Sequence, residues 1–226
     1  MKRDIITSAI AIIVFTILLG LVYPLVITGF SQVAFPGDAN GQKVYVDGRL
    51  VGSKIIGQSF ATPVLEKNGK PKEVKGVVVT EADPRYFQTR PSATEGGADN
   101  AAASTFSNKG PNSVKTREAD EENIKAYLEL NKNPATKTEY DSGLTASKIP
   151  VDAVNSSASG LDPEISPANA WIQGYRVAVV RHLSRSTVDG LIAKYTSGRG
   201  LGFSGEEGVN VLELNLALDR LEKGNS

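Results

Sequence analysis

Few residues in this chain could carry out chemistry. The chain has no cysteine, which excludes a disulfide framework, a thiol nucleophile and a thiolate metal site. His182 is the only histidine, so a metal site built on a histidine pair is excluded as well. A lone histidine near a predicted helix end is more often a surface or capping residue than a catalyst. A serine hydrolase using Ser92 or Ser107 would need a base and an oxyanion site, and neither is apparent in the sequence.

Two further groups of residues invite a functional reading. The segment 198–205 resembles a phosphate-binding loop in its glycine content alone. It lacks the Gly-Lys-Ser/Thr ending, and no strand precedes it immediately, so we interpret it as a turn or linker. Arg85 and Arg90 lie close to Tyr86 and Phe87 and could stack or pair at an interface, although packing at the surface explains them equally well.

The overall composition is that of an ordinary globular protein. The 226 residues are 40% hydrophobic and 22% charged, with 25 basic and 25 acidic side chains. This length suits one domain and leaves room for a small second unit. Neutrality provides no electrostatic footprint for nucleic acid, so we expect no nucleic-acid partner.

The charged residues are distributed unevenly. Residues 5–37 contain no Asp, Glu, Lys or Arg, and residues 5–22 are almost wholly apolar. A bilayer is spanned by about 20 helical residues, so we expect one transmembrane helix over residues 5–35, in which Pro24 favours a kink. The alternative is a cleaved secretory signal with a cleavage site at 31–34. The apolar core of such a signal runs only about 7–15 residues, and this run is longer.

The flanks of the apolar segment predict its orientation. Lys2 and Arg3 precede it closely, whereas no comparable basic pair follows until beyond residue 42. The positive-inside rule therefore places residues 1–4 in the cytoplasm and residues 36–226 outside the cytoplasmic membrane. A single span without an ionisable residue provides neither a pore nor an intramembrane ion site, so any part in transport would be an accessory one.

We expect residues 36–226 to form a soluble α+β domain with long connections. Asp47-Gly48 between alternating apolar residues predicts a hairpin over 43–51 with a type I′ turn. Residues 74–80 predict a further strand. Residues 91–116 are poor in large apolar groups, and a loop of that length should either carry function or be mobile.

Three segments predict helices: residues 120–130, residues 166–183 and residues 186–195. The second should begin with a Ser-Pro pair, in which serine is the N-cap and proline the first helical residue. Trp171 and Tyr175 fall on the apolar stripe of that helix, so we expect them in the core.

The last regular element, residues 211–219, is ambiguous. Its leucines alternate with other residues, which predicts a strand with one buried face. A helix is the alternative, because Leu214 and Leu218 also satisfy a four-residue spacing.

Four segments carry distinctive residue patterns: residues 85–94, 107–112, 157–167 and 209–219. In this order they resemble the signature blocks of the KdpC family, whose members belong to the bacterial Kdp potassium-transporting P-type ATPase. The N-terminal helix with its Tyr-Pro pair and the residues around Ile56-Gly-Gln58 resemble the family too.

The chain also departs from the family pattern in three places. About 20 residues, roughly 61–83, look like an insertion, a length that exceeds an ordinary connection of about 4–6 residues. Gln88 stands where the family often has tryptophan, and Glu164 where it often has histidine. These departures concern local loops and leave the order of the shared blocks intact.

The resemblance implies a noncatalytic subunit of a potassium pump that binds no cofactor directly, with ATP and potassium acting at the level of the complex. The implied partners are a channel-like potassium-binding subunit, a P-type ATPase subunit and a small single-helix subunit. Members of the family are held to stabilise the assembly, and they have been described as catalytic chaperones that raise the affinity of the ATPase subunit for ATP. An independent adhesive or sensor domain tethered to the membrane is the alternative.

The shared blocks supply candidate residues for partner contact or for the shape of the family motifs. We expect fold maintenance to outweigh partner contact in each block, with residues 86–113 as the best interface candidate. The candidates are Arg85, Tyr86, Phe87, Arg90, Pro91, Ser92, Asn108, Gly110, Pro111, Gly160, Leu161, Asp162, Pro163, Ser166, Pro167, Asn210 and Asn215.

Overall fold

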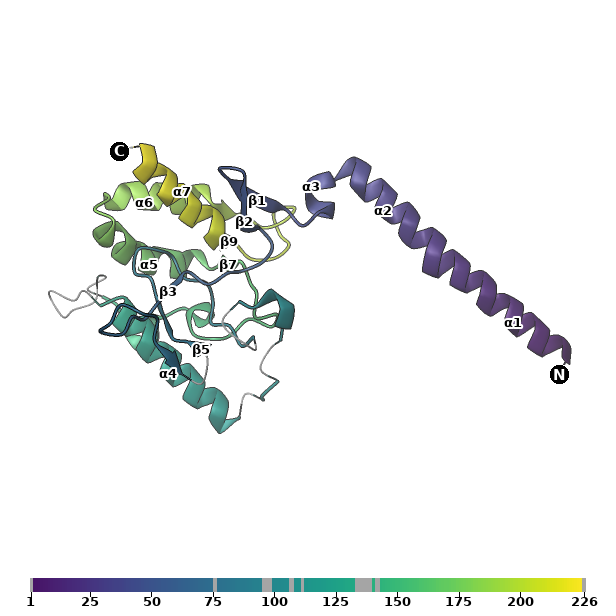
Figure 1. The fold of residues 1–226 in the computed structure, drawn as a ribbon, viewed down its shortest axis with the longest axis horizontal. Coiled ribbons are helices and arrows are strands. Elements are labelled where there is room, and N and C mark those ends of the chain that lie inside the picture. The colour runs from purple at the N-terminus through teal and green to yellow at the C-terminus, as the bar shows by residue number, and fades with distance from the viewer. Residues whose placement is uncertain are drawn as a thin grey trace. The chain divides into compact units, whose positions relative to one another are not determined.

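The computed structural model describes residues 2–74, 77–94, 99–105, 108–110, 112–132, 140 and 143–224. The chain divides into two compact units, of which the first ends at Ser53 and the second begins at Lys54. Figure 1 shows the helices and strands of both. Unit 1 contains the N-terminal helix, a single helical turn and one β-hairpin, and unit 2 contains the other helices and strands of the described residues.

Unit 1 begins with one long helix. It consists of α1 (Lys2–Ile17), a π-helical turn η1 (Leu18–Val22) and α2 (Tyr23–Ala34). These 33 residues form the only helix in the described chain that is long and apolar enough to cross a membrane. Pro24 has no N–H and its ring would clash with the carbonyl of Gly20 in a regular helix. The wider π turn relieves this clash, and the N–H of Tyr23 reaches back five residues to the carbonyl of Leu18.

A hairpin follows a single helical turn, α3 (Pro36–Ala39). Its strands, β1 (Lys43–Val46) and β2 (Arg49–Ser53), pair antiparallel. Asp47 and Gly48 have φ values of 49° and 77°, so both turn residues adopt the positive φ of a type I′ turn. The predicted hairpin is therefore confirmed.

The single strand predicted over 74–80 is wrong. β4 (Glu73–Val74) instead pairs with β5 (Val77–Val78), and β6 (Thr80–Ala82) pairs with β3 (Ala61–Pro63). The predicted strand is thus divided between two antiparallel ribbons, and all four strands of these ribbons come from residues 61–82.

A small antiparallel sheet joins distant parts of unit 2. Its strand order is β7-β9-β8. Ile165 and Thr196 both stand opposite Val209, which lies in the central strand. The strands are β7 (Glu164–Ile165), β8 (Thr196–Ser197) and β9 (Gly208–Asn210).

The helices of unit 2 form two groups, with α5, α6 and α7 together and α4 on the other side (Figure 1). Short 3-10 turns lie at Ala101–Ala103, Ala146–Lys148 and Val151–Ala153. The bounds of the long helices are α4 (Val114–Leu130), α5 (Pro167–Val180), α6 (Arg185–Lys194) and α7 (Val211–Gly224).

The three predicted helices are confirmed with shifted ends. α4 begins six residues before residue 120, and α5 ends at Val180 rather than 183. The Oγ of Ser166 accepts the N–H of Asn169 at 3.1 Å, which confirms Ser166 as N-cap. α6 is capped by Ser184, two residues before the predicted start.

The strand predicted over 211–219 is wrong, since this segment lies within α7. Val211, Leu214 and Leu218 are fully buried, and they recur at intervals of three and four residues. Asn215 is also fully buried and falls on the same face. Only a helix places this asparagine beside the leucines, whereas a strand would have turned it outward.

The main core of unit 2 combines Phe87 and Ile165 with apolar residues of α5, α6 and α7. A smaller cluster gathers Tyr127, Leu144 and Ala153 near α4. The prediction that Trp171 and Tyr175 are core residues is wrong, because they are 53% and 39% exposed. α5 turns its polar Gln173 and Arg176 inward instead.

Candidate functional site

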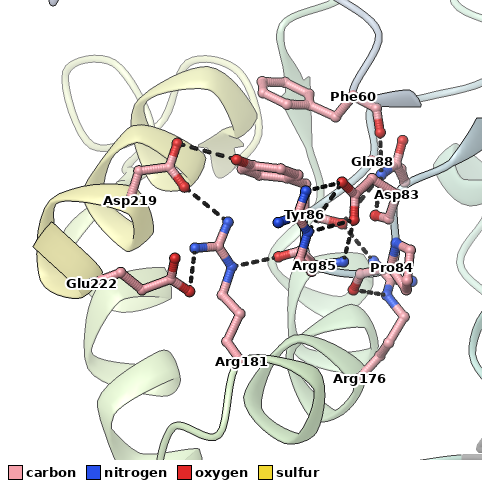
Figure 2. A network of polar contacts seen from close by, with 10 residues as sticks. All are labelled: Phe60, Asp83, Pro84, Arg85, Tyr86, Gln88, Arg176, Arg181, Asp219 and Glu222. Atoms are coloured by element: carbon pink, nitrogen blue, oxygen red, sulfur yellow. Dashed lines mark hydrogen bonds and ion pairs between the residues drawn. The ribbon is translucent and has the colours of Figure 1, made fainter. Parts of the chain in front are cut away.

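Arg176 lies fully buried on α5 and binds the segment that begins the first shared block (Figure 2). Its Nε donates to the carbonyl of Pro84 at 3.1 Å, and its Nη2 donates to the carbonyl of Tyr86 at 2.8 Å. Its Nη1 also donates to Asn131 Oδ1 at 2.8 Å, and its Nη2 donates to Gln173 Oε1 at 3.0 Å. Burial lowers the pKa of Arg176 to about 10, so the guanidinium stays charged at neutral pH.

Arg181, just past the end of α5, binds Arg85, the residue between the two that Arg176 binds. Its Nε donates to the carbonyl of Arg85 at 2.7 Å. Its other nitrogens lie 2.9 Å from Asp219 Oδ1 and 2.8 Å from Glu222 Oε1 (Figure 2). The guanidinium also covers the ring of Tyr86, with 4.5 Å to the centroid. One buried cation therefore joins α5, α7 and the segment.

Asp83 begins the segment with a tight turn. Its Oδ1 accepts the N–H of Arg85 at 2.9 Å, and its Oδ2 lies 2.7 Å from Arg85 Nη2. Burial alone would raise the pKa of Asp83, but the hydrogen bonds and charge of Arg85 bring it below its usual value. The side chain of Gln88 closes this turn, because its Nε2 donates to the carbonyls of Phe60, Asp83 and Tyr86 (Figure 2).

Two buried amide side chains hold the segment as a neighbouring strand would. Asn215 Oδ1 accepts the N–H of Phe87 at 2.9 Å, and Asn215 Nδ2 donates to the carbonyl of Phe87 at 2.9 Å. Gln173 does the same for Gln88, at 2.8 and 3.1 Å. Residues 83–88, held by buried side chains of α5 and α7 and by Arg181, are called the clamped segment below.

The chain after the clamped segment binds the block around residue 160. Arg90 forms an ion pair with Asp162 at 3.0 Å. The Oγ of Ser92 donates to the carbonyl of Gly160 at 2.8 Å and accepts the N–H of Asp99 at 3.0 Å. A Cβ at Gly160 would lie 2.7 Å from Thr94 Cγ2, and its φ is +70°, so only glycine fits there.

The block around residue 160 also contacts Gly57 and the start of α7. Gly57 donates its N–H to the carbonyl of Leu161 at 2.7 Å, and a Cβ on Gly57 would lie 2.6 Å from the carbonyl oxygen of Asp162. The carbonyl of Pro163 accepts the N–H of Val211 at 3.0 Å. These contacts bring the shared blocks together in three dimensions.

Two further candidates fix helix starts. Ser166 donates its Oγ to Asp152 Oδ1 at 2.8 Å, in addition to capping α5, where Pro167 is the first residue. Asn210 Oδ1 accepts the N–H of Glu213 at the start of α7, and Asn210 Nδ2 donates to the carbonyl of Lys54 at 2.7 Å.

The remaining candidates lie at the surface or outside the described residues. Asn108 and Gly110 are exposed, and the side chain of Arg85 is 57% exposed. Pro91 lines two open grooves, of about 560 and 510 Å³, that reach α4. Pro111 and Ser107 fall outside the described residues.

Sequence reasoning missed the residues that hold the site together: Gln173, Arg176, Arg181 and Asn131. The sequence did contain a signal for two of them. Gln173 and Arg176 recur at helical spacing with Ala170 and Val177, so they lie on the same buried face of α5. The periodicity of apolar residues placed Trp171 and Tyr175 on the inward face of this helix instead.

The isolated features considered for chemistry have local explanations. His182 is exposed and follows α5 with a φ of 55°, as expected of a residue at a helix end. The glycine-rich segment forms a turn in which Gly200 donates to the carbonyl of Ser204 at 2.7 Å. Within the described residues, no group of three His, Asp or Glu side chains could hold a metal ion.

Comparison with known proteins identifies the family. Residues 5–220 match the family model described as KdpC: K+-transporting ATPase, c chain. The chain belongs to the KdpC family. Potassium-transporting ATPase KdpC subunits from Mycobacterium tuberculosis and Koribacter versatilis are each 42% identical to it, over 98% and 97% of this chain and 100% and 95% of their own lengths. The subunit from Methylococcus capsulatus is 42% identical over 95% of this chain and 96% of its own length.

Proposed function

We propose that this chain is a noncatalytic accessory subunit of a high-affinity potassium uptake pump. In this role it stabilises the assembly of a channel-like potassium-binding subunit, an ATP-hydrolysing P-type subunit and a small single-helix subunit. The family to which the chain belongs and the names of its relatives, which are subunits of a potassium-transporting ATPase, support this proposal.

The contacts made within unit 2 by Ser92 of the first shared block, and by the two arginines that bind this block, support the noncatalytic part of the proposal. The donors of Arg176 and Arg181 bind backbone carbonyls and side chains of the same unit. The hydroxyl of Ser92 is likewise engaged with Gly160 and Asp99. Groups committed to such contacts build a rigid body, which is what an accessory subunit needs in order to present fixed surfaces to its partners.

The orientation proposed is N-terminus inside, with residues 36–226 outside the cytoplasmic membrane. It is supported by Lys2 and Arg3 on one side of the apolar helix. ATP is confined to the cytoplasm, so in this orientation it acts on the complex without touching unit 2. Any effect of the chain on the affinity of the ATPase subunit for ATP is then a coupling free energy transmitted through contacts between subunits.

A labelling experiment tests the orientation. Because the chain has no cysteine, Glu118→Cys on the exposed face of α4 provides a unique thiol, and Lys2→Cys provides its counterpart before the span. A membrane-impermeant maleimide applied to cells with a permeable outer envelope should label Glu118→Cys and spare Lys2→Cys. The reverse pattern would refute the orientation.

The accessory role is tested by purification. The C-terminally tagged chain, extracted in mild detergent from potassium-starved cells, should bring down a polytopic channel-like subunit and a P-type ATPase in a fixed ratio. A chain that is recovered alone, although correctly folded, would contradict the proposal in favour of an independent tethered domain.

A further inference from the structure

The turn between β8 and β9 exposes two large apolar side chains. Leu201 is 90% exposed and Phe203 is 76% exposed, and both lie in the turn that Gly200 and Ser204 close. Isolated apolar side chains are normal at a protein surface. Here, however, two of them share the tip of one turn and leave most of their apolar area in solvent. Residues 200–204 are called the apolar turn below.

The backbone conformation makes leucine an unexpected residue at position 201. Its φ is +54°, in the left-handed region that favours glycine and asparagine. A leucine there strains the backbone, and its side chain gains almost no burial in return. The folding of the turn therefore does not account for this side chain, whereas a contact with another surface does.

The backbone of the apolar turn is satisfied by its own hydrogen bonds. Gly200 and Ser204 each donate an N–H to the carbonyl of the other, at 2.7 and 2.8 Å. Gly202 donates to the carbonyl of Arg199 at 3.0 Å, and Phe203 donates to that of Gly200 at 3.2 Å. An N–H without a partner is costly outside water, so a turn closed in this way is suited to the interface of a lipid bilayer.

The charged residues flank the apolar turn and leave its tip neutral. Residues 200–205 contain no charged side chain. Arg199 precedes them and pairs with Glu206, which follows them, at 2.7 Å. Glu207 adds a negative charge, so the turn offers no attraction for an anionic surface. A contact made by its tip should therefore be apolar and insensitive to salt.

The chain enters unit 2 beside the strand that carries the apolar turn. Lys54 is the first residue of unit 2 and pairs with Glu213 at 2.6 Å. Its carbonyl accepts the Nδ2 of Asn210, in β9, at 2.7 Å. Ser197 and Gly208, the last pair of β8 and β9 before the turn, lie two residues from Asn210 along β9. The covalent link to the N-terminal helix therefore joins unit 2 within a few residues of the apolar turn.

The link between the N-terminal helix and unit 2 is also short. The β1–β2 hairpin returns the chain to its starting point, because Ser53 pairs with Lys43 and donates its Oγ to the carbonyl of Gly41 at 2.6 Å. Only residues 35–42, half of them in α3, separate the N-terminal helix from the hairpin. Such a link spans at most about 20 Å, so a bilayer crossed by the helix is present at a high effective concentration.

We propose that the apolar turn inserts Leu201 and Phe203 into the interface of the bilayer that the N-terminal helix crosses, and so gives unit 2 a second membrane attachment. Lipid suits this turn better than a protein partner does. A bilayer needs no complementary pocket, whereas a standard protein interface takes about 20–30 residues a side, and leucine is under-represented among its hot spots.

Two side chains suffice because the covalent link has already removed most of the entropic cost of association. The proposed contact goes beyond the proposed function. It depends on the apolar N-terminal helix and holds whether or not the chain serves a pump.

Fluorescence in the full-length chain tests the insertion. Because the chain has no cysteine, Phe203→Cys provides a unique thiol for an environment-sensitive aromatic dye, which stands in for the phenyl ring. Leu65→Cys, at another apolar position of unit 2 that is 62% exposed, is the matched control. In vesicles of zwitterionic phosphatidylcholine, nitroxide-labelled lipid should quench the dye at 203 several-fold more than the dye at 65. Equal quenching at the two positions overturns the proposal.

A second substitution separates membrane contact from folding. Leu201→Asn, made in the labelled Phe203→Cys chain, places a residue that tolerates positive φ at the strained position. The thermal midpoint should stay the same or rise, while quenching by nitroxide-labelled lipid falls several-fold. Unchanged quenching, or a lower midpoint that assigns the leucine to the fold, overturns the proposal. Quenching that added salt abolishes would also overturn it, since apolar insertion is not screened.

Crosslinking identifies the occupant in native membranes. A photoactivatable maleimide on Phe203→Cys should crosslink to lipid, whereas a crosslink to another protein or to a second copy of this chain overturns the proposal. The two proposals fail separately. A chain that is purified without partners, but whose turn crosslinks to lipid, contradicts only the proposed function. A chain that recovers its partners, but whose turn is not quenched by lipid, contradicts only the membrane contact.

Discussion

Asn215 of α7 satisfies both backbone polar groups of Phe87, 128 positions away in the sequence. The amide oxygen and nitrogen each lie 2.9 Å from their backbone partner, and both residues are fully buried. A side chain thus does for Phe87 what a neighbouring β-strand does elsewhere. The clamped segment therefore depends on the identity of single amino acids, where a strand would tolerate most of them.

Asn215→Leu should destabilise the fold strongly. Leucine has a similar size but leaves the N–H and carbonyl of Phe87 buried without partners, at about 1–3 kcal/mol each. The midpoint of thermal unfolding of the detergent-solubilised chain, followed by circular dichroism, should fall by about 5–20 °C. Asn108→Leu, at an exposed position, is the control and should change stability by less than about 0.5 kcal/mol.

Arg176→Met should destabilise unit 2 by about 3–5 kcal/mol, because it leaves the carbonyls of Pro84 and Tyr86 and the side chain of Asn131 without donors. Arg220→Met, on the exposed side of α7, is the matched control. Urea denaturation of the two variants measures the difference. Similar midpoints would show that buried water can replace the guanidinium.

Alanine substitutions at three glycines should distinguish the cost of backbone strain from the cost of a steric clash. Gly160→Ala meets both, since φ is +70° and the new Cβ would lie 2.8 Å from the carbonyl of Thr105. Gly202→Ala meets only a positive φ, and Gly198→Ala meets neither. Stability should fall by about 1 kcal/mol for Gly202→Ala and by more for Gly160→Ala, with almost no loss for Gly198→Ala. Any other order of thermal midpoints contradicts this assignment.

Asp99→Asn should change the pH dependence of stability. Burial raises the pKa of Asp99 to about 6, with the hydroxyl of Thr89 partly opposing the shift. The folded state then binds the proton more tightly than the unfolded state does, so this group makes the protein less stable as the pH rises from about 4 to 6.

Asparagine tolerates the positive φ of 57° at this position, so the substitution removes the titration without straining the backbone. The stability of Asp99→Asn relative to the wild type should therefore increase as the pH rises from about 4 to 6. Above that range the difference in unfolding free energy should stay constant. A difference that is constant from acid to neutral pH would show that the Asp99 carboxyl is well solvated.

Local signals predicted the local structures. The Asp47-Gly48 turn and the N-cap at Ser166 depend on dihedral and hydrogen-bonding preferences of neighbouring residues, which a sequence displays directly. The α7 segment was assigned to the wrong class because its leucines satisfy both periodicities. Knowing that Asn215 faces inward would have decided between helix and strand. Its inward orientation, however, depends on Phe87, which is 128 positions away in the sequence.

The inside and outside of α5 could not be assigned by hydrophobicity. Periodicity assumes that apolar residues face the core, whereas Arg176 and Gln173 are buried because the clamped segment offers them backbone partners. Trp171 and Tyr175 were displaced to the surface as a result. The family blocks located the clamped segment but not the side chains that hold it.

The clamp also has a consequence for the order of folding. Arg176 joins residues 45 or more positions apart, and Asn215 belongs to α7, the last helix of the described chain. The backbone groups of Phe87 can form these hydrogen bonds only after α7 has been synthesised. The earlier parts of unit 2 therefore cannot complete the hydrogen bonds of the clamped segment by themselves. A polypeptide interrupted before residue 211 would therefore remain open to proteases, and unit 2 becomes resistant only when nearly its full length has been made.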